Sequence, residues 1–69
     1  MIDPKLKTLL CVVKEGSYTK AAELLALSQP AVSYHVRQLE DELGIKVFYR
    51  NQKKLTLTPE GEVLINGHN

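Results

Sequence analysis

The sequence has no tryptophan, a single cysteine and no long apolar run, and its 69 residues carry a net charge of only +1. One cysteine, Cys11, cannot form an internal disulfide, so we expect a reducing compartment, the cytoplasm. No stretch approaches the roughly 20 apolar residues that a membrane span needs. The N-terminus also lacks the basic-then-apolar order of a secretory signal. These absences leave one small globular domain that neither spans a membrane nor depends on disulfides.

Groups that could perform catalysis or bind a metal are also scarce. Ser33 and His35 lie two residues apart on a predicted helix and therefore point about 200° apart. His35, His68 and Cys11 do not have the spacing of metal ligands, and a structural zinc site needs four converging ligands. Cys11 itself is expected to be a small apolar side chain rather than a reactive thiol. We therefore expect no enzymatic activity, no metal site and no cofactor.

Capping residues predict three helices in the first two thirds of the chain. Each follows an Asp or Ser whose side chain can accept a hydrogen bond from a first-turn backbone N–H. The predicted helices span residues 4–15, 18–26 and 29–43, with N-caps Asp3, Ser17 and Ser28 and with Gly16 and Gly44 as stops. Residues 27–28 leave room only for a tight turn. The second and third helices must therefore cross steeply, as in a helix-turn-helix.

Apolar residues at helical spacing define the expected core. The stripe of the first helix is Leu6, Leu9, Leu10 and Val13, with Cys11 and Val12 toward its edge, and that of the third is Val32, Val36, Leu39 and Leu43. Consecutive alanines, Ala21 and Ala22, indicate that the second helix approaches a neighbour closely. The fold class is therefore mainly α.

The periodicity changes after Gly44. β-prone residues 47–50, a polar stretch over 51–54 and alternation over 55–57 predict a two-stranded β-hairpin, a wing. Phe48 should close the core under the wing, with Leu55 and Leu57 facing the helices.

A fourth helix should begin directly after the wing. Thr58 is its expected N-cap and Pro59 its first residue, and its apolar residues are Val63, Leu64 and Ile65. We thus divide the chain into a winged helix-turn-helix over 1–58 and the start of a linker helix over 59–69.

The expected binding surface is the polar side of the third helix, whose N-terminal half carries no acid. A helix-turn-helix places this part of its second helix in the DNA major groove. The candidate DNA-binding residues are Gln29, Pro30, Ser33, Tyr34 and Arg37 on this helix, Lys20 in the preceding helix, and Arg50 and Lys53 in the wing. Gln29 can read adenine through its amide. Arg50 and Lys53 should meet flanking phosphates or the minor groove.

Alternatives remain for the cations of this surface. Lys20 can equally be a solvated lysine, and Arg37 can equally pair with Asp41 four residues later. The basic run of Lys46, Arg50, Lys53 and Lys54 can be a solvated loop as readily as a phosphate-binding edge.

Several motifs occur here in one order and spacing: Gly16-Ser17-Tyr18-Thr19-Lys20-Ala21-Ala22, Leu27-Ser28-Gln29-Pro30-Ala31-Val32-Ser33, Val47-Phe48-Tyr49-Arg50 and Leu57-Thr58-Pro59-Glu60-Gly61. Together they resemble the N-terminal domain of LysR-type transcriptional regulators over nearly the whole chain. The resemblance implies a bacterial transcription factor that binds double-stranded promoter DNA as a homodimer through its linker helix. It also implies that a small-molecule effector binds a C-terminal domain outside these residues. This chain would then be a fragment, either a monomer or a weak dimer.

Three positions depart from the family pattern. Leu9 stands where phenylalanine is frequent, and Tyr34 and His35 stand where arginine and glutamine are common. A tyrosine at 34 removes a bidentate guanidinium contact, so the preferred DNA sequence should differ from the family's commonest one. The alternative function is a winged-helix module that docks a partner protein through its third helix and does not bind DNA.

Overall fold

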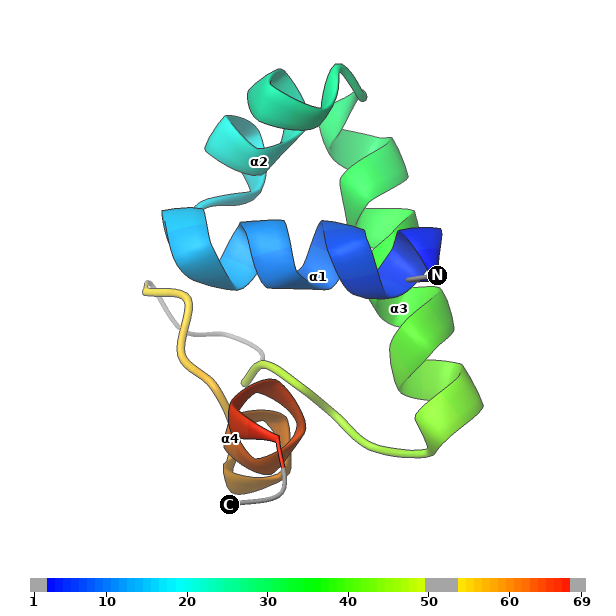
Figure 1. The fold of residues 1–69 in the computed structure, drawn as a ribbon, viewed down its shortest axis with the longest axis vertical. Coiled ribbons are helices and arrows are strands. Elements are labelled where there is room, and N and C mark those ends of the chain that lie inside the picture. Colours follow the sequence, from blue (N-terminus) through cyan, green and yellow to red (C-terminus); the bar gives the residue numbers. More distant parts are fainter. Residues whose placement is uncertain (1–2, 50–53, 68–69) are drawn as a thin grey trace.

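The computed structural model describes residues 3–49 and 54–67. In these residues the chain forms four helices: α1 (Pro4–Glu15), α2 (Tyr18–Leu25), α3 (Gln29–Leu43) and α4 (Pro59–Asn66). α1 packs on both α2 and α3, and α2 packs on α3 (Figure 1). α4 lies on the other side of α1 from α2 (Figure 1). The mainly helical fold class is confirmed.

The predicted caps account for the helix bounds. In each helix the N-cap side chain accepts a hydrogen bond from a first-turn backbone N–H. The pairs are Asp3 with Lys5 (2.7 Å), Ser17 with Lys20 (3.1 Å), Ser28 with Ala31 (3.2 Å) and Thr58 with Gly61 (2.9 Å). Gly16 and Gly44 end their helices in the left-handed conformation, with φ of 68° and 70°. All four starts and these two stops are as predicted.

The predicted end of α2 was wrong by one residue. Ala26 is not helical but is a left-handed C-cap with φ of 58°. The N–H of Leu27 donates to the carbonyl of Ala22 at 2.9 Å, which turns the chain sharply toward α3. The tight turn between α2 and α3 therefore begins at Ala26, which was expected to be the last helical residue.

The core joins three helices to the segment after α3. Its buried residues are Leu9, Val12, Ala21, Ala22, Val32, Val36, Leu39, Val47 and Phe48. Phe48 is 4% exposed and meets Tyr18 edge-on, with ring centroids 6.1 Å apart. Leu55 and Leu57 pack against this core. The predictions for Phe48, Leu55 and Leu57 are confirmed.

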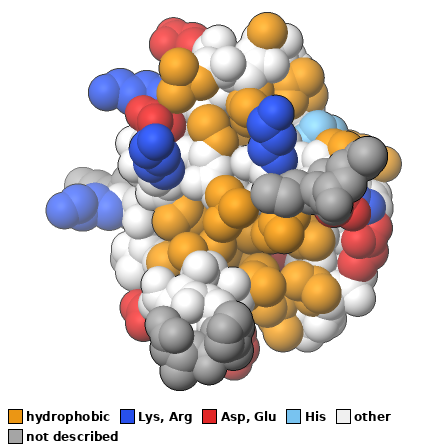
Figure 2. All heavy atoms as spheres, in the orientation of Figure 1, with side chains coloured by type: hydrophobic (Ala, Val, Ile, Leu, Met, Phe, Trp, Pro, Cys, Tyr) orange, Lys and Arg blue, Asp and Glu red, His pale blue; other side chains and the backbone are white. Residues whose placement is uncertain are grey.

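Three apolar positions differ from the expected stripes. Val12, expected at the edge, is fully buried, because α1 is covered by both α2 and α3 and its inner face is therefore wider than one stripe. Leu10 and Leu43, expected inside, are 37% and 46% exposed. Leu43 lies in the last turn of α3. Figure 2 shows that apolar side chains form a broad patch on the face of the molecule that is turned to the viewer.

The described residues contain no β-strand at the expected wing. Phe48 and Leu57 form an isolated antiparallel bridge. Beside it, the N–H of Tyr49 donates to the carbonyl of Thr56 at 3.0 Å. Residues 50–53, which hold the expected turn, lie outside the described part of the chain. The two-stranded hairpin therefore stays a prediction.

Close backbone packing attaches α4 to the segment after α3. A Cβ built on Gly61 would lie 2.3 Å from the carbonyl oxygen of Val47, so only glycine allows this approach. The N–H of Thr58 donates to the same carbonyl at 2.9 Å, and the Thr58 hydroxyl donates to the carbonyl of Lys46. Val63, expected to be an apolar contact of α4, is 68% exposed.

Glu40 is buried, although acidic side chains are usually exposed to solvent. Its side chain is 2% exposed and accepts a hydrogen bond from the N–H of Val47 at 2.7 Å. Its backbone carbonyl also accepts from the N–H groups of Gly44 and Ile45. Glu40 thus links the last turns of α3 to the segment that carries α4.

Candidate nucleic-acid interface

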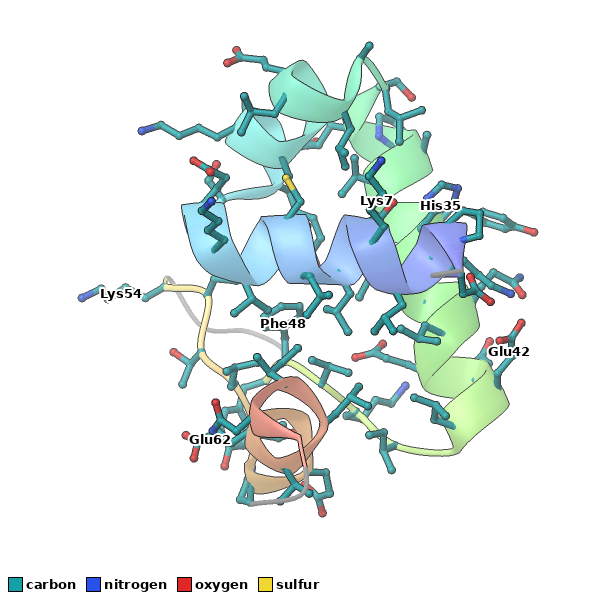
Figure 3. All side chains as sticks on the ribbon, in the orientation of Figure 1. Lys7, His35, Glu42, Phe48, Lys54 and Glu62 are labelled. Carbon is teal, nitrogen blue, oxygen red and sulfur yellow. The ribbon has the colours of Figure 1, made fainter. Side chains whose placement is uncertain are left out.

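The outward side of α3 holds most of the candidate residues. Gln29, Pro30, Tyr34 and Arg37 are exposed and Ser33 is half-buried. The same helix buries Val32, Val36 and Leu39 against α1 and α2. α3 is therefore amphipathic, with an apolar face toward the core and a polar face toward solvent. The first three turns of the polar face carry no acidic side chain. In Figure 3, α3 crosses α1 near the N-terminal end of α1 and extends beyond it.

A side-chain contact joins the first turns of α2 and α3. The Gln29 Nε2 donates to the Thr19 Oγ1 at 3.2 Å, and both side chains are exposed. Thr19 precedes Lys20, which is also exposed. The structure thus brings Thr19 of α2 and Gln29 of α3 together. Sequence reasoning missed Thr19 as a site residue, because a contact between two helices leaves no signal in the periodicity of either one.

Arg37 does not pair with Asp41. Lys5–Glu42 is the one ion pair within residues 3–49 and 54–67, so the guanidinium of Arg37 carries no carboxylate partner there. Arg37, Glu40, Asp41 and Lys46 line a hollow of about 210 Å³. Arg37 and Lys46 therefore lie around one depression on the surface.

Two contacts fix α3 against the N-terminal half of α1. Lys5 pairs with Glu42, and the hydrogen bond that Lys5 donates to this carboxylate raises the pKa of Lys5. Thr8 Oγ1 lies 2.8 Å from Nδ1 of His35 and donates to the carbonyl of Pro4 at 3.0 Å. A hydroxyl has only one proton, and the Pro4 carbonyl can only accept. With the Thr8 proton directed to Pro4, the tautomer that fits this contact is the one in which Nδ1 of His35 donates a hydrogen bond to Thr8 Oγ1.

His35 accordingly belongs to the α1–α3 packing rather than to the outer face. It is half-buried against α1, and its ring lies beside that of Tyr34 with centroids 6.5 Å apart. Tyr34, at 60% exposure, is directed into solvent. Tyr34 and His35 both depart from the family pattern, and of these two Tyr34 is the one on the candidate interface.

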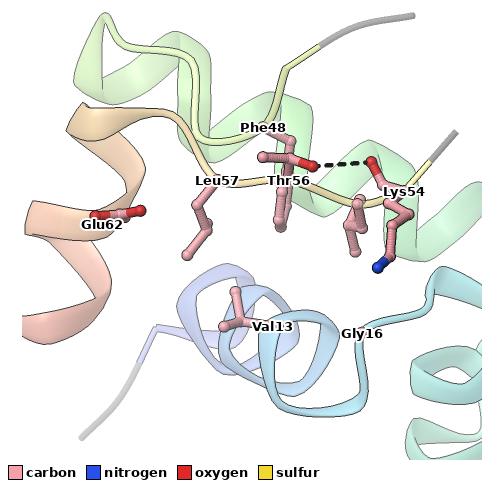
Figure 4. A pocket seen from close by; sticks show the side chains of 8 residues that line it. Val13, Gly16, Phe48, Lys54, Thr56, Leu57 and Glu62 are labelled. Carbon is pink, nitrogen blue, oxygen red and sulfur yellow. Dashed lines mark hydrogen bonds between the residues drawn. The ribbon is translucent and has the colours of Figure 1, made fainter. Parts of the chain in front are cut away.

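The wing residues Arg50 and Lys53 lie outside the described part of the chain. Lys54, which follows them, is exposed and borders a pocket of about 370 Å³ between α1, the residues around Leu57 and α4 (Figure 4). Within the described ranges no group of three or more His, Cys, Asp or Glu residues could hold a metal ion. No helix there is long and apolar enough to cross a membrane.

Known proteins resemble this chain in sequence. It is 48% identical over 59 residues to the HTH-type transcriptional regulator CysL of Bacillus subtilis, which covers 86% of this chain and 20% of that protein. It is 53% identical over 57 residues to the RuBisCO operon transcriptional regulator of Allochromatium vinosum, covering 83% and 19%. The chain thus spans about a fifth of the length of the curated relatives it matches.

Solved structures agree with these relatives. The BenM DBD in complex with catB site 1 DNA superimposes with a TM-score of 0.88 at 38% identity, covering 96% of this chain and 71% of that one. A transcriptional regulator of the LysR family from Eggerthella lenta gives 0.86 at 42% identity, covering 96% and 94%. Residues 4–62 match the family model of the bacterial regulatory helix-turn-helix proteins of the lysR family. The chain belongs to the lysR family of bacterial regulatory helix-turn-helix proteins.

Proposed function

We propose that this chain binds double-stranded promoter DNA sequence-specifically and thereby regulates transcription in the bacterial cytoplasm. The observation that carries the proposal is the placement of α3: the first three turns of its outer face carry no acidic side chain, and the helix follows directly after a tight turn from α2. This is the arrangement in which a helix-turn-helix enters the major groove. The likeness to the BenM DBD in its complex with DNA supports the same partner.

The residues take roles that follow from their chemistry. Gln29, Ser33, Tyr34 and Arg37 read base edges in the major groove, since their exposed or half-buried polar groups share the outer face of α3. Pro30 fixes the first turn of that helix. Lys20 in α2 meets a phosphate, because the Thr19–Gln29 contact brings this turn of α2 to the same edge.

The wing and the linker helix complete the proposal. Residues 47–57 form a two-stranded hairpin whose Arg50 and Lys53 contact the DNA backbone or the minor groove. Residues 1–58 are the DNA-binding unit, and the helix from Pro59 is the start of a linker that pairs with its twin in a homodimer. A small-molecule effector acts on the remainder of the longer regulator, consistent with relatives about five times the length of this match.

A gel-shift experiment on mixed genomic DNA tests DNA binding directly. The chain should retain DNA at low salt, and retention should collapse as salt rises, because phosphate contacts release counterions. Arg37→Glu should abolish retention. Lys14→Glu makes the same charge change in the last turn of α1, away from the end of α1 that contacts α3, and should retain DNA. A chain that shows no retention at low salt would instead be a protein-docking winged helix.

A further inference from the structure

We infer that Thr19 is a positioning residue for base readout: its hydroxyl holds the side-chain amide of Gln29 at the start of α3. This inference rests on the proposed DNA-binding function and extends it from α3 to a residue on α2. The observation is the hydrogen bond from Nε2 of Gln29 to Oγ1 of Thr19 at 3.2 Å, which joins the first turns of the two helices.

The contact with Thr19 leaves the groups of the Gln29 amide that would read a base available. A glutamine amide has two N–H donors and one carbonyl acceptor. Thr19 engages one N–H and leaves the second N–H and Oε1 available. Adenine needs this pair, since its N7 accepts and its N6 amino group donates in the major groove. The contact therefore occupies a surplus donor and preserves the reading pair.

Restraint of the side chain matters because an unrestrained glutamine samples many rotamers before it meets a base. Gln29 is exposed, and nothing else in the described part of the chain hydrogen-bonds its side-chain amide. The hydrogen bond to Thr19 restricts this flexible side chain before DNA is met, so less conformational entropy is lost when Gln29 contacts a base.

The test compares base selection by Thr19→Val, which keeps the branched shape and removes the hydroxyl, with Thr19→Ser, which keeps the hydroxyl. DNA bound by the 69-residue chain is selected from a random pool, and affinities are then measured for operators altered at single base pairs. Thr19→Val should reduce discrimination at the Gln29 base position by about threefold to tenfold, the loss expected for one hydrogen bond. Thr19→Ser should keep most of it, and Thr19→Ala provides a second variant without the hydroxyl.

A double-mutant cycle with Gln29→Ala separates positioning from a direct phosphate contact. Thr19→Val should change nothing further in the Gln29→Ala background, and the slope of log affinity against log salt should stay unchanged. Uniform weakening on all sequences would overturn the inference, as would an unaltered Thr19→Val profile beside an altered Gln29→Ala profile. If the unchanged chain selected no DNA sequence, the proposed function itself would fail and the inference with it. Circular dichroism of each variant verifies that it folds.

Discussion

The side-chain carboxylate of Glu40 accepts the backbone N–H of Val47 at 2.7 Å, and both residues are buried. This hydrogen bond crosses from α3 to the segment that precedes α4. A backbone donor in this position has no water to replace a lost acceptor, so the acid acts as a structural anchor rather than as a surface charge.

Glu40→Ala should lower the free energy of unfolding by about 1–3 kcal/mol, because it leaves the Val47 N–H buried without an acceptor. Glu40→Gln keeps an acceptor and should lose less. Urea unfolding followed by circular dichroism measures both. The control is Asp41→Ala at the exposed neighbouring position, which should change stability by about 0.5 kcal/mol or less. Equal losses at 40 and 41 would contradict the anchoring role.

Ala26→Gly should stabilise the domain by about 0.5–1 kcal/mol. Ala26 adopts a left-handed conformation with φ of 58°, which glycine adopts without the steric cost of a Cβ. The gain is smaller than that steric cost because glycine also loses more backbone entropy on folding. Thermal unfolding should show a midpoint higher by a few degrees. Ala31→Gly, the same change inside α3, should lower the midpoint, and a lower midpoint for Ala26→Gly would refute the argument.

Gly61→Ala should cost about 1–3 kcal/mol or more, since the added Cβ would meet a backbone carbonyl that cannot rotate away. Hydrogen exchange should also become faster across α4. Gly44→Ala is the comparison: its Cβ meets open space, and only the left-handed backbone is strained, at about 1 kcal/mol. Slow exchange in α4 of Gly61→Ala would show that the close approach is not needed.

Arg50→Ala should weaken binding to every DNA sequence and reduce the slope of log affinity against log salt by about one unit, as expected for the loss of one phosphate contact. The affinity is measured at several salt concentrations on a selected and a random duplex. Lys14→Ala should leave the slope unchanged. An altered base preference with an unaltered slope would assign Arg50 to base readout instead.

The Lys5–Glu42 pair predicts a specific pH dependence. Its hydrogen bond raises the pKa of Lys5 in the folded protein. The stabilisation is therefore fully present below the ordinary lysine pKa and is lost as the pH rises through the raised value. Lys5→Met should reduce the unfolding midpoint slightly and equally at pH 7 and pH 9, and the difference should shrink at strongly alkaline pH and in high salt. A difference that grows with pH would be inconsistent with this pair.

Local signals account for most of what was predictable from the sequence. N-caps and glycine stops act within one helical turn, so Asp3, Ser17, Ser28 and Thr58 located the helix starts without knowledge of the fold. The exposed side of α3 followed from its periodicity. The family motifs added promoter regulation and the homodimer to these predictions, which periodicity alone does not specify.

Tertiary contacts account for what was missed. A glutamate is usually expected on the surface. Glu40 is buried because the segment after Gly44 packs over it and Val47 donates a backbone hydrogen bond to its carboxylate. Val12 is buried because two helices cover α1. The Thr19–Gln29 contact depends on how closely the starts of α2 and α3 approach, which no spacing along the sequence encodes.

The contact between Gly61 and Val47 connects α4 to α3. The backbone of α4 touches Val47 with no side chain between them to absorb a shift, and the N–H of Val47 is held by Glu40 of α3. α4 is thus connected to the last turns of α3 through two successive contacts, Gly61 with Val47 and Val47 with Glu40.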